Sequence, residues 1–109
     1  SVWKEMADLG WLGIAVPEEF GGIGLSLAEV VPVVEQMGRT LMSNPLVPTT
    51  LVAQVILKGG SPEQQKALLP GLASGTIATL ALTEEHADWD LTNLTCNATD
   101  KGDELVLSG

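Results

Sequence analysis

Residues 59–83 read GGSPEQQKALLPGLASGTIATLALT, and this stretch contains both the clearest helix start in the chain and the change to strand-like sequence. Ser61 can cap a helix, the proline after it suits the first helical position, and Gln64 completes a capping box. We expect this helix to be short, because the Pro70-Gly71 pair interrupts it. The helical part of the chain is therefore predicted to end soon after this pair.

The sequence changes character at Thr76. Residues 76–83 are β-branched and apolar and follow a helix boundary, which predicts a buried strand. Residues 94–99 mix apolar and short polar side chains, residues 100–103 read DKGD, and residues 104–107 are typical of a returning strand. These features predict a β-hairpin. Because two or three strands with open edges are a poor end for a domain, we expect the sequence to be cut from a longer protein.

Two further helices are predicted near the N-terminus. The first ends at Gly10. The second begins at Ser26, where Glu29 completes a second capping box, and Pro32 is expected to kink it. The apolar residues expected to face the core are Val2, Trp3, Met6 and Leu9 in the first helix and Leu27, Val30, Val31, Val34, Met37 and Leu41 in the second.

A third helix is predicted to start at a cap by Thr49 or Thr50 and to end at Lys58, before two glycines. Its expected buried stripe consists of Leu51, Val52, Val55 and Ile56. Residues 10–24 are glycine-rich and predicted to be a connection, with an apolar segment over 14–16 that we expect to be buried. The glycines of this connection favour a tight turn over a phosphate-binding loop, since their spacing fits neither common motif and no lysine follows.

Together these patterns predict an α+β fragment, with an all-α helical domain over residues 1–75 followed by the first strands of a β domain over residues 76–109. The 109 residues are 45% hydrophobic and 17% charged, a globular balance that excludes wholesale disorder. Five Lys and Arg against fourteen Asp and Glu give a net charge of −9, which argues against nucleic acid or an anionic membrane surface as partner. The apolar runs are far shorter than the roughly 20 residues that span a bilayer.

Several side chains that could act as acids, bases or metal ligands follow the predicted strand of residues 76–83. Glu84, Glu85, His86, Asp88 and Asp90 form an acidic cluster with the only histidine. Their order matches no calcium loop, and one histidine is too few for a transition-metal site, so we predict a solvated loop and no metal site. Loops at strand ends are nevertheless where functional sites are often built.

The tryptophans and the cysteine have simpler interpretations. Trp3 and Trp11 are expected to be core or interface anchors. Trp89 lies among carboxylates, and two interpretations stay open: it contacts a ligand or partner, or it has no such role. Cys96 is the only cysteine, so an internal disulfide is excluded. It is expected to be an inert, half-buried thiol because no histidine is near it.

Four stretches, taken in order, resemble the acyl-CoA dehydrogenase family. They read LGWLGIAVPEEFGGIG over residues 9–24, VEQMGR over 34–39, GGSPEQQK through LPGLASG over 59–75, and ALTE over 81–84. Each stretch is weak alone, but the ordered set is specific, and the similarity covers essentially the whole chain.

The resemblance implies a flavoenzyme with an N-terminal helical domain, a middle β-barrel domain and a C-terminal four-helix bundle, with FAD between the last two. A glutamate base in such enzymes removes the α-proton of an acyl-CoA thioester, and the β-hydride passes to the flavin. The product is a 2-enoyl-CoA, and an electron-transferring flavoprotein usually takes the electrons. The base comes from a region beyond residue 109, so we expect no catalytic residue in this chain and no activity from it alone.

Some site residues carry over from the resemblance. Leu82 and Thr83 match positions that contact the flavin ring, and Leu80 stands where some members have an aromatic side chain near flavin and substrate. Trp89 replaces a small serine near flavin and substrate, and Asp88 adds negative charge beside it. An indole and a carboxylate there would disfavour the anionic CoA and FAD phosphates and could fill the pocket.

Two function classes follow. The first is an FAD-dependent acyl-CoA dehydrogenase, of which this chain is the N-terminal portion. The second is a non-catalytic, degenerate subunit or interaction module of the same family, which the Asp88-Trp89-Asp90 departure motivates. By analogy the protein is expected to form a homo- or hetero-oligomer. It is expected in the cytoplasm of a bacterium or in the mitochondrial matrix of a eukaryote.

Overall fold

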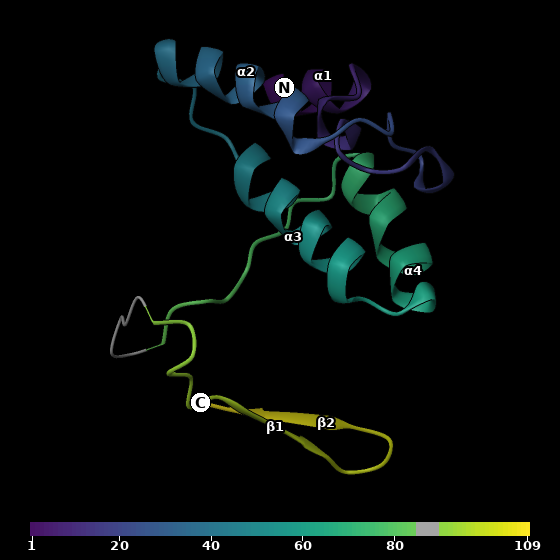
Figure 1. Ribbon diagram of the computed structural model, residues 1–109, viewed down its shortest axis with the longest axis vertical. Helices are drawn as coiled ribbons and strands as arrows, with labels where there is room; N and C mark the ends of the chain where they lie inside the picture. The colour runs from purple at the N-terminus through teal and green to yellow at the C-terminus, as the bar shows by residue number, and fades with distance from the viewer. Residues whose placement is uncertain (85–89) are drawn as a thin grey trace.

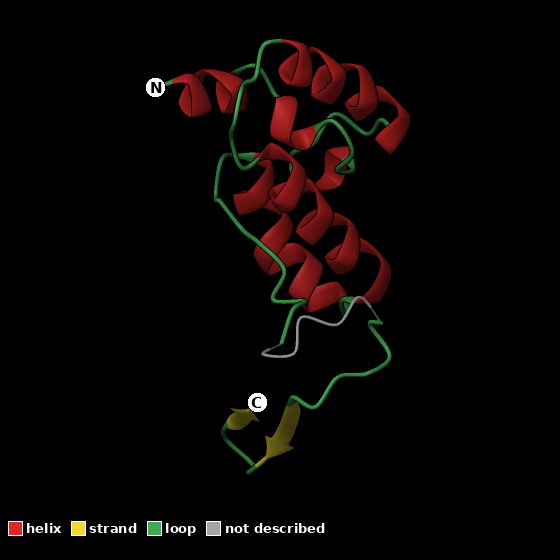
Figure 2. Ribbon diagram, turned by 90° about the vertical axis from the view of Figure 1, so that its left-hand side faces the viewer, coloured by secondary structure: helices red, strands yellow, loops and turns green. Residues whose placement is uncertain are grey.

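The computed structural model describes residues 1–84 and 90–109. Helices come first and a small sheet last, so the predicted α+β fragment is confirmed (Figure 1). The elements in chain order are the α-helix α1 (Val2–Asp8), the 3-10 helices η1 (Trp11–Gly13) and η2 (Glu18–Phe20), the α-helices α2 (Leu27–Arg39), α3 (Leu46–Gly59) and α4 (Pro62–Ala73), and the strands β1 (Asn97–Asp100) and β2 (Leu105–Ser108). The helices gather at one end of the molecule and the strands lie at the other (Figure 2).

Both predicted capping boxes are confirmed. At α2, the Ala28 N–H donates to Ser26 Oγ at 3.1 Å, and the Ser26 N–H donates to Glu29 Oε2 at 2.8 Å. At α4, the Gln64 N–H donates to Ser61 Oγ at 3.3 Å, and the Ser61 N–H donates to Gln64 Oε1 at 2.9 Å. These bonds satisfy N–H groups that have no partner within the helix, so side chains fix both helix starts.

The internal prolines do not end their helices. Helix α2 runs unbroken through Pro32, and α4 continues past Pro70 and Gly71 to Ala73, so the predicted early end of α4 is wrong. A proline removes one backbone hydrogen bond, but the last turn of α4 buries Leu69, Leu72 and Ala73 against the rest of the protein. Burial of this apolar surface outweighs the lost hydrogen bond and the low helix propensity.

Helix α3 starts earlier than predicted. Its N–H groups begin to be satisfied at Leu46, which donates to Asn44 Oδ1 at 2.9 Å. The expectation that Thr49 or Thr50 caps this helix is therefore wrong, because both threonines lie buried inside it. Sequence alone does not distinguish a threonine that caps a helix from a threonine inside the helix. The packing around the side chain decides between these two positions.

The predicted buried stripe of α3 is half correct. Val52 and Ile56 are partly buried and pack against the core, whereas Leu51 is 47% exposed and Val55 is exposed as well. The fully buried residues of this helix are Leu46, Thr49, Thr50 and Ala53. Small and hydroxyl-bearing side chains let α3 approach its neighbours closely, and α4 packs beside it (Figure 1).

Part of the connection over residues 10–24 belongs to the core, since residues 12–16 and Phe20 are buried. Its Val16 and Phe20 pack with α3 and α4, its Leu12 packs with α1, α2 and α3, and its residues 14–15 pack with α2. The expectation that residues 14–16 are buried is therefore confirmed. Helix α2 covers one side of this connection, and α3 and α4 cover another.

The predicted glycine turn is confirmed. Gly21 and Gly24 have φ angles of +82° and +76°, which side chains with a Cβ rarely adopt. Gly22 lies so close to the preceding turn that a Cβ on it would be 2.0 Å from the Val16 carbonyl oxygen. The glycines allow the chain to fold back on itself here, and the Gly24 N–H donates to the same oxygen at 2.8 Å.

The predicted apolar faces of α1 and α2 are only partly correct. Met6, Val30 and Met37 are buried as expected, whereas Leu41 is 90% exposed. The other predicted core residues that stay largely exposed are Val2, Leu9, Leu27 and Val31. Both helices lie at the surface of the helical part, so each buries only one narrow side.

The strand predicted over residues 76–83 is wrong. This segment carries no strand assignment, and Ile77 and Leu82 are exposed. A strand requires a neighbour to complete its hydrogen bonds, and within the described residues β1 and β2 pair only with each other. The predicted hairpin is confirmed, with Asn97 opposite Ser108 and Asp100 opposite Leu105. The domain boundary after residue 75 and the further strands of a barrel stay predictions.

Candidate functional site

An open groove separates the extended segment before residue 85 from the hairpin. We call it the hairpin groove, and its volume is about 550 Å³. It is lined by Ala81, Leu82, Thr83, Glu84, Leu94, Thr95, Cys96, Leu107, Ser108 and Gly109. Leucine side chains and hydroxyl groups share its walls, so it can contact a flat apolar ring and also hydrogen-bond to its edge.

The hairpin groove brings together two of the predicted site residues. Leu82 and Thr83 both line it, and the Thr83 hydroxyl makes no hydrogen bond to any described residue. Leu80 is partly buried but is not among the lining residues. Asp88 and Trp89 lie outside the described residues, so their predicted roles stay predictions.

Glu84 connects the two walls of the hairpin groove. Its Oε2 accepts hydrogen bonds from the Thr95 N–H at 2.9 Å and the Thr95 hydroxyl at 2.6 Å. Its Oε1 accepts from the Cys96 N–H at 2.7 Å and also lies 3.0 Å from the Thr95 nitrogen. Sequence reasoning places Glu84 in a solvated acidic loop and misses Thr95, because no local pattern links residues eleven positions apart.

Two contacts with the helical part fix where the extended segment begins. Trp3 Nε1 donates to the Gly75 carbonyl oxygen at 2.9 Å. Three residues later, the Thr49 hydroxyl donates to the Ala78 carbonyl oxygen and accepts from the Ala78 N–H, both at 3.3 Å. Thr49 is only 2% exposed, so these bonds form away from water, where their loss costs most. The segment that reaches Leu82 thus leaves α4 in a defined direction.

Asp90 and Cys96, two further residues of this part of the chain, are both exposed. Hydrogen bonds from the Thr92 side chain and backbone hold the pKa of Asp90 below its ordinary value. Cys96 is exposed, so the expectation of a half-buried thiol is wrong; the strand predicted over its position begins one residue later. Among residues 1–84 and 90–109, no three His, Cys, Asp or Glu side chains lie close enough together to hold a metal ion.

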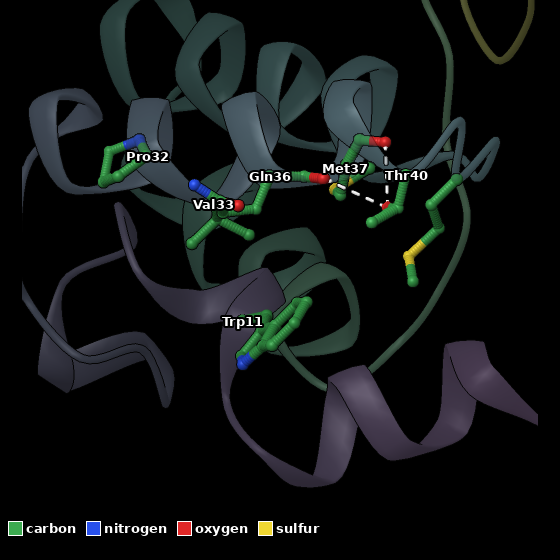
Figure 3. A pocket seen from close by; sticks show the side chains of 7 residues that line it. Trp11, Pro32, Val33, Gln36, Met37 and Thr40 are labelled. Carbon is green, nitrogen blue, oxygen red and sulfur yellow. Dashed lines mark hydrogen bonds between the residues drawn. The ribbon is translucent and has the colours of Figure 1, made fainter.

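A second groove lies on the helical part, beside α2. Its volume is about 430 Å³, and its lining is Trp11, Pro32, Val33, Gln36, Met37, Thr40 and Met42 (Figure 3). The Thr40 hydroxyl donates back to the carbonyl oxygens of Gln36 and Met37, at 3.0 and 3.2 Å. None of the lining side chains titrates near neutral pH, so this groove offers an apolar surface and no acid–base chemistry. Trp11 serves as an anchor here, as the sequence predicts.

Comparison with known proteins identifies relatives of the chain. It is 41% identical over 109 residues to (2S)-methylsuccinyl-CoA dehydrogenase of Cereibacter sphaeroides, a match that covers 97% of this chain and 20% of that protein. It is 36% identical over 111 residues to mitochondrial isovaleryl-CoA dehydrogenase of Bos taurus, covering 98% of this chain and 26% of that protein. The chain therefore spans between a fifth and about a quarter of the length of these relatives.

A solved structure shares the fold. One chain of the ChsE4-ChsE5 complex from Mycobacterium tuberculosis superposes with a TM-score of 0.81 at 30% identity, covering 98% of this chain and 28% of that one. Within the described part of the chain, none of the helices is both long and apolar enough to cross a membrane. The family described as "Acyl-CoA dehydrogenase, N-terminal domain" matches residues 1–76, and the chain therefore belongs to the acyl-CoA dehydrogenase family.

Proposed function

We propose that this chain is the N-terminal portion of an FAD-dependent acyl-CoA dehydrogenase. The whole protein would oxidise an acyl-CoA thioester to the 2-enoyl-CoA, with FAD as the hydride acceptor. The observation that carries the proposal is the hairpin groove, where Leu82 and Thr83 lie together at the junction of the helical part and the hairpin. Family membership and the two relatives, a methylsuccinyl-CoA dehydrogenase and an isovaleryl-CoA dehydrogenase, support the same reaction.

The lining of the hairpin groove fits part of a flavin site. A flavin ring has two apolar faces and an edge of hydrogen-bonding nitrogen and oxygen atoms. Leu82, Leu94 and Leu107 offer apolar contact, and the Thr83 hydroxyl makes no hydrogen bond to the described residues. The described residues that line the groove all lie within residues 81–109, so the remainder of a closed site would come from other parts of the whole protein.

The chain's own residues would bind and orient. FAD, when bound, supplies the hydride acceptor. Leu82 would pack against the ring, and the Thr83 hydroxyl would hydrogen-bond to its edge, which limits rotation of the ring within the site. We assign no base to this chain, because Glu84, the carboxylate in the groove lining, already accepts hydrogen bonds from Thr95 and Cys96.

The partners and location follow from the same proposal. The substrate would be an acyl-CoA, and an electron-transferring flavoprotein would accept the electrons. The relatives include bacterial and mitochondrial proteins, which supports the cytoplasm of a bacterium or the mitochondrial matrix of a eukaryote as the location. We also propose that the whole protein is an oligomer, as its relative in the ChsE4-ChsE5 complex assembles with a second protein.

Purification of the full-length protein tests this function. We expect it to retain FAD, seen as flavin absorbance, and we expect an acyl-CoA such as isovaleryl-CoA to bleach that absorbance without oxygen. A panel of straight and branched acyl-CoA thioesters guards against a wrong choice of substrate. A full-length protein that neither retains FAD nor responds to any thioester of the panel would contradict the proposal.

A second candidate function is that of a non-catalytic subunit. It is favoured by Trp89 and Asp88, which stand where the resemblance implies a small serine and no added charge. A large indole and an extra carboxylate would obstruct binding of a flavin or of an anionic CoA. Two-protein assemblies such as the ChsE4-ChsE5 complex make a pairing of unlike subunits structurally reasonable.

Substitution of Trp89 separates the two functions. If the indole blocks the site, Trp89→Ser in the full-length protein should tighten flavin or acyl-CoA binding markedly. Trp11→Phe is the control, because it changes a tryptophan of the groove beside α2 while keeping an aromatic ring against the core. Unchanged affinities in Trp89→Ser would count against a blocked site and leave the dehydrogenase as the working function.

A further inference from the structure

We propose that Glu84 is a positioning residue that fixes the hairpin groove and thereby the placement of Thr83 toward the flavin. This inference rests on the proposed function, because it concerns the same site. It assigns Glu84 a structural task within that site and no proton transfer. Three observations support this inference: the hydrogen bonds of Glu84, its place in the chain, and the low rigidity of the hairpin itself.

The geometry around Glu84 is that of a carboxylate held by converging donors. The Thr95 hydroxyl lies 2.6 Å away, the Cys96 N–H 2.7 Å away and the Thr95 N–H 2.9 Å away. These donors use both carboxylate oxygens. Charge-assisted hydrogen bonds of this kind are shorter and stronger than neutral ones, so three donors converging on one carboxylate hold it firmly.

The place of Glu84 in the chain makes this anchor effective. Thr83 is its direct neighbour, and the segment around them lies outside any sheet. Thr83 and Glu84 are joined by one planar peptide unit and line the same groove, so a fixed Glu84 side chain also restricts the backbone at Thr83. Without the anchor, the Thr83 hydroxyl would sample several directions.

The hairpin supplies little rigidity by itself. Every residue of β1 and β2 is exposed, and an isolated two-stranded hairpin is marginally stable in water. The residues that bond Glu84 immediately precede β1, at Thr95 and Cys96. The carboxylate therefore joins the base of the hairpin to the segment that carries Leu82 and Thr83, and it sets the distance between the walls of the groove.

The experiment uses the full-length protein and three variants. Glu84→Ala removes the carboxylate, Glu84→Gln keeps its shape without the charge, and Thr95→Val removes one donor while keeping a β-branched side chain. Glu104→Gln is the control, since Glu104 is an exposed carboxylate in the hairpin turn. Two quantities are measured: deuterium exchange of the Thr95 and Cys96 amides without flavin, and the dissociation constant and absorption spectrum of bound FAD.

We expect Glu84→Ala to speed exchange of both amides at least tenfold and to weaken FAD binding about tenfold. A tenfold change equals about 1.4 kcal/mol, close to the loss of one hydrogen bond to a charged group. The amide exchange rates and FAD dissociation constants of Glu84→Gln and Thr95→Val should lie between those of Glu84→Ala and the wild type. Those of Glu104→Gln should match the wild type. A shifted flavin spectrum in the Glu84 variants would reflect the displaced Thr83 hydroxyl, which a general loss of stability would not produce.

The outcomes separate this inference from the proposed function. If the wild type retains FAD and the Glu84 variants bind it with equal affinity and spectrum, the inference is overturned and the function stands. If the wild type binds no FAD, both the function and the flavin role of Glu84 are overturned. If Glu84→Ala does not fold, Glu84→Gln and Thr95→Val carry the test, and unchanged exchange and binding in both would overturn the inference.

Discussion

The helical part and the hairpin differ in what they bury. In the helical part, Val16, Leu46 and Leu69 are almost completely removed from water, and residues 12–16 of the glycine-rich connection are buried with them. In the hairpin, every strand residue is exposed. Local rules are obeyed equally well in both, since the helices are capped and the hairpin turn is formed. The difference teaches that correct local structure does not require a core, whereas stability does.

The largest expected effect comes from emptying the core of the helical part. Leu46 has 0% exposure and packs with Met6, Leu12 and Met37. Leu46→Ala should lower the free energy of unfolding by about 2–5 kcal/mol, because it leaves a cavity that neighbours fill only partly. Leu107→Ala in the hairpin, at 72% exposure, should change it by less than about 0.5 kcal/mol. Urea unfolding followed by circular dichroism measures both, and equal losses would remove the distinction between the two regions.

Crowding the centre of the helical part should have the next largest effect. Gly22→Ala would place a Cβ against the Val16 carbonyl, and we expect a loss of about 1–3 kcal/mol as the backbone shifts. A Cβ on Gly38 in α2 would meet no neighbouring atom within 4 Å, so Gly38→Ala should be neutral or gain up to about 1 kcal/mol. Thermal unfolding of the two variants gives the comparison. A stable Gly22→Ala variant would mean that the turn can open without cost.

Cutting the link between the two regions should have a smaller effect. Thr49→Val keeps the shape of the side chain but removes the hydroxyl that bonds both backbone groups of Ala78. We expect a loss of about 1–2 kcal/mol and faster deuterium exchange of the Ala78 amide. Thr49→Ser restores the hydroxyl and should restore amide protection. Equal exchange in the Val variant and the wild type would show that Thr49 does not hold the segment.

The smallest expected effect is a pH dependence at a helix start. Hydrogen bonds from the Ser26 side chain and backbone hold the pKa of Glu29 below its ordinary value of 4.5. Because the folded-state pKa is the lower one, this contribution to stability is present above pH 4.5 and is lost as pH falls through the depressed folded-state value. Comparison of Glu29→Gln with the wild type by thermal unfolding between pH 7 and pH 3 tests this. The difference between the two proteins should shrink as the pH falls, and a constant difference would contradict the assignment.

The features that could be predicted from sequence are those formed by residues close together in the chain. Ser26 with Glu29, Ser61 with Gln64, and the glycine turn each involve residues within a few positions of one another, and all form as expected. The fully buried positions of α3 could not be predicted, because the Thr49 hydroxyl finds its hydrogen-bond partner at Ala78, twenty-nine residues away.

The same reasoning applies to the candidate site. Leu82 and Thr83 follow from a resemblance, and the structure places both on one groove. The bonds between Glu84 and Thr95 escape prediction, since eleven residues separate them and no periodicity connects them. The strand expected over residues 76–83 fails for a related reason. Its composition favours a strand, but a strand forms only where a partner strand is present.

The bond between Trp3 and Gly75 has a consequence for how the protein is made. It joins residues 72 positions apart, so Trp3 leaves the ribosome long before the carbonyl that it binds has been synthesised. At roughly 5–20 residues per second, that interval lasts several seconds. During this time the Trp3 indole N–H lacks its acceptor, although the residues that α1 packs against, Leu12, Met37 and Leu46, are made earlier. Helix α1 is synthesised before α2, α3 and α4, and it is thus among the last of the described helices to finish docking.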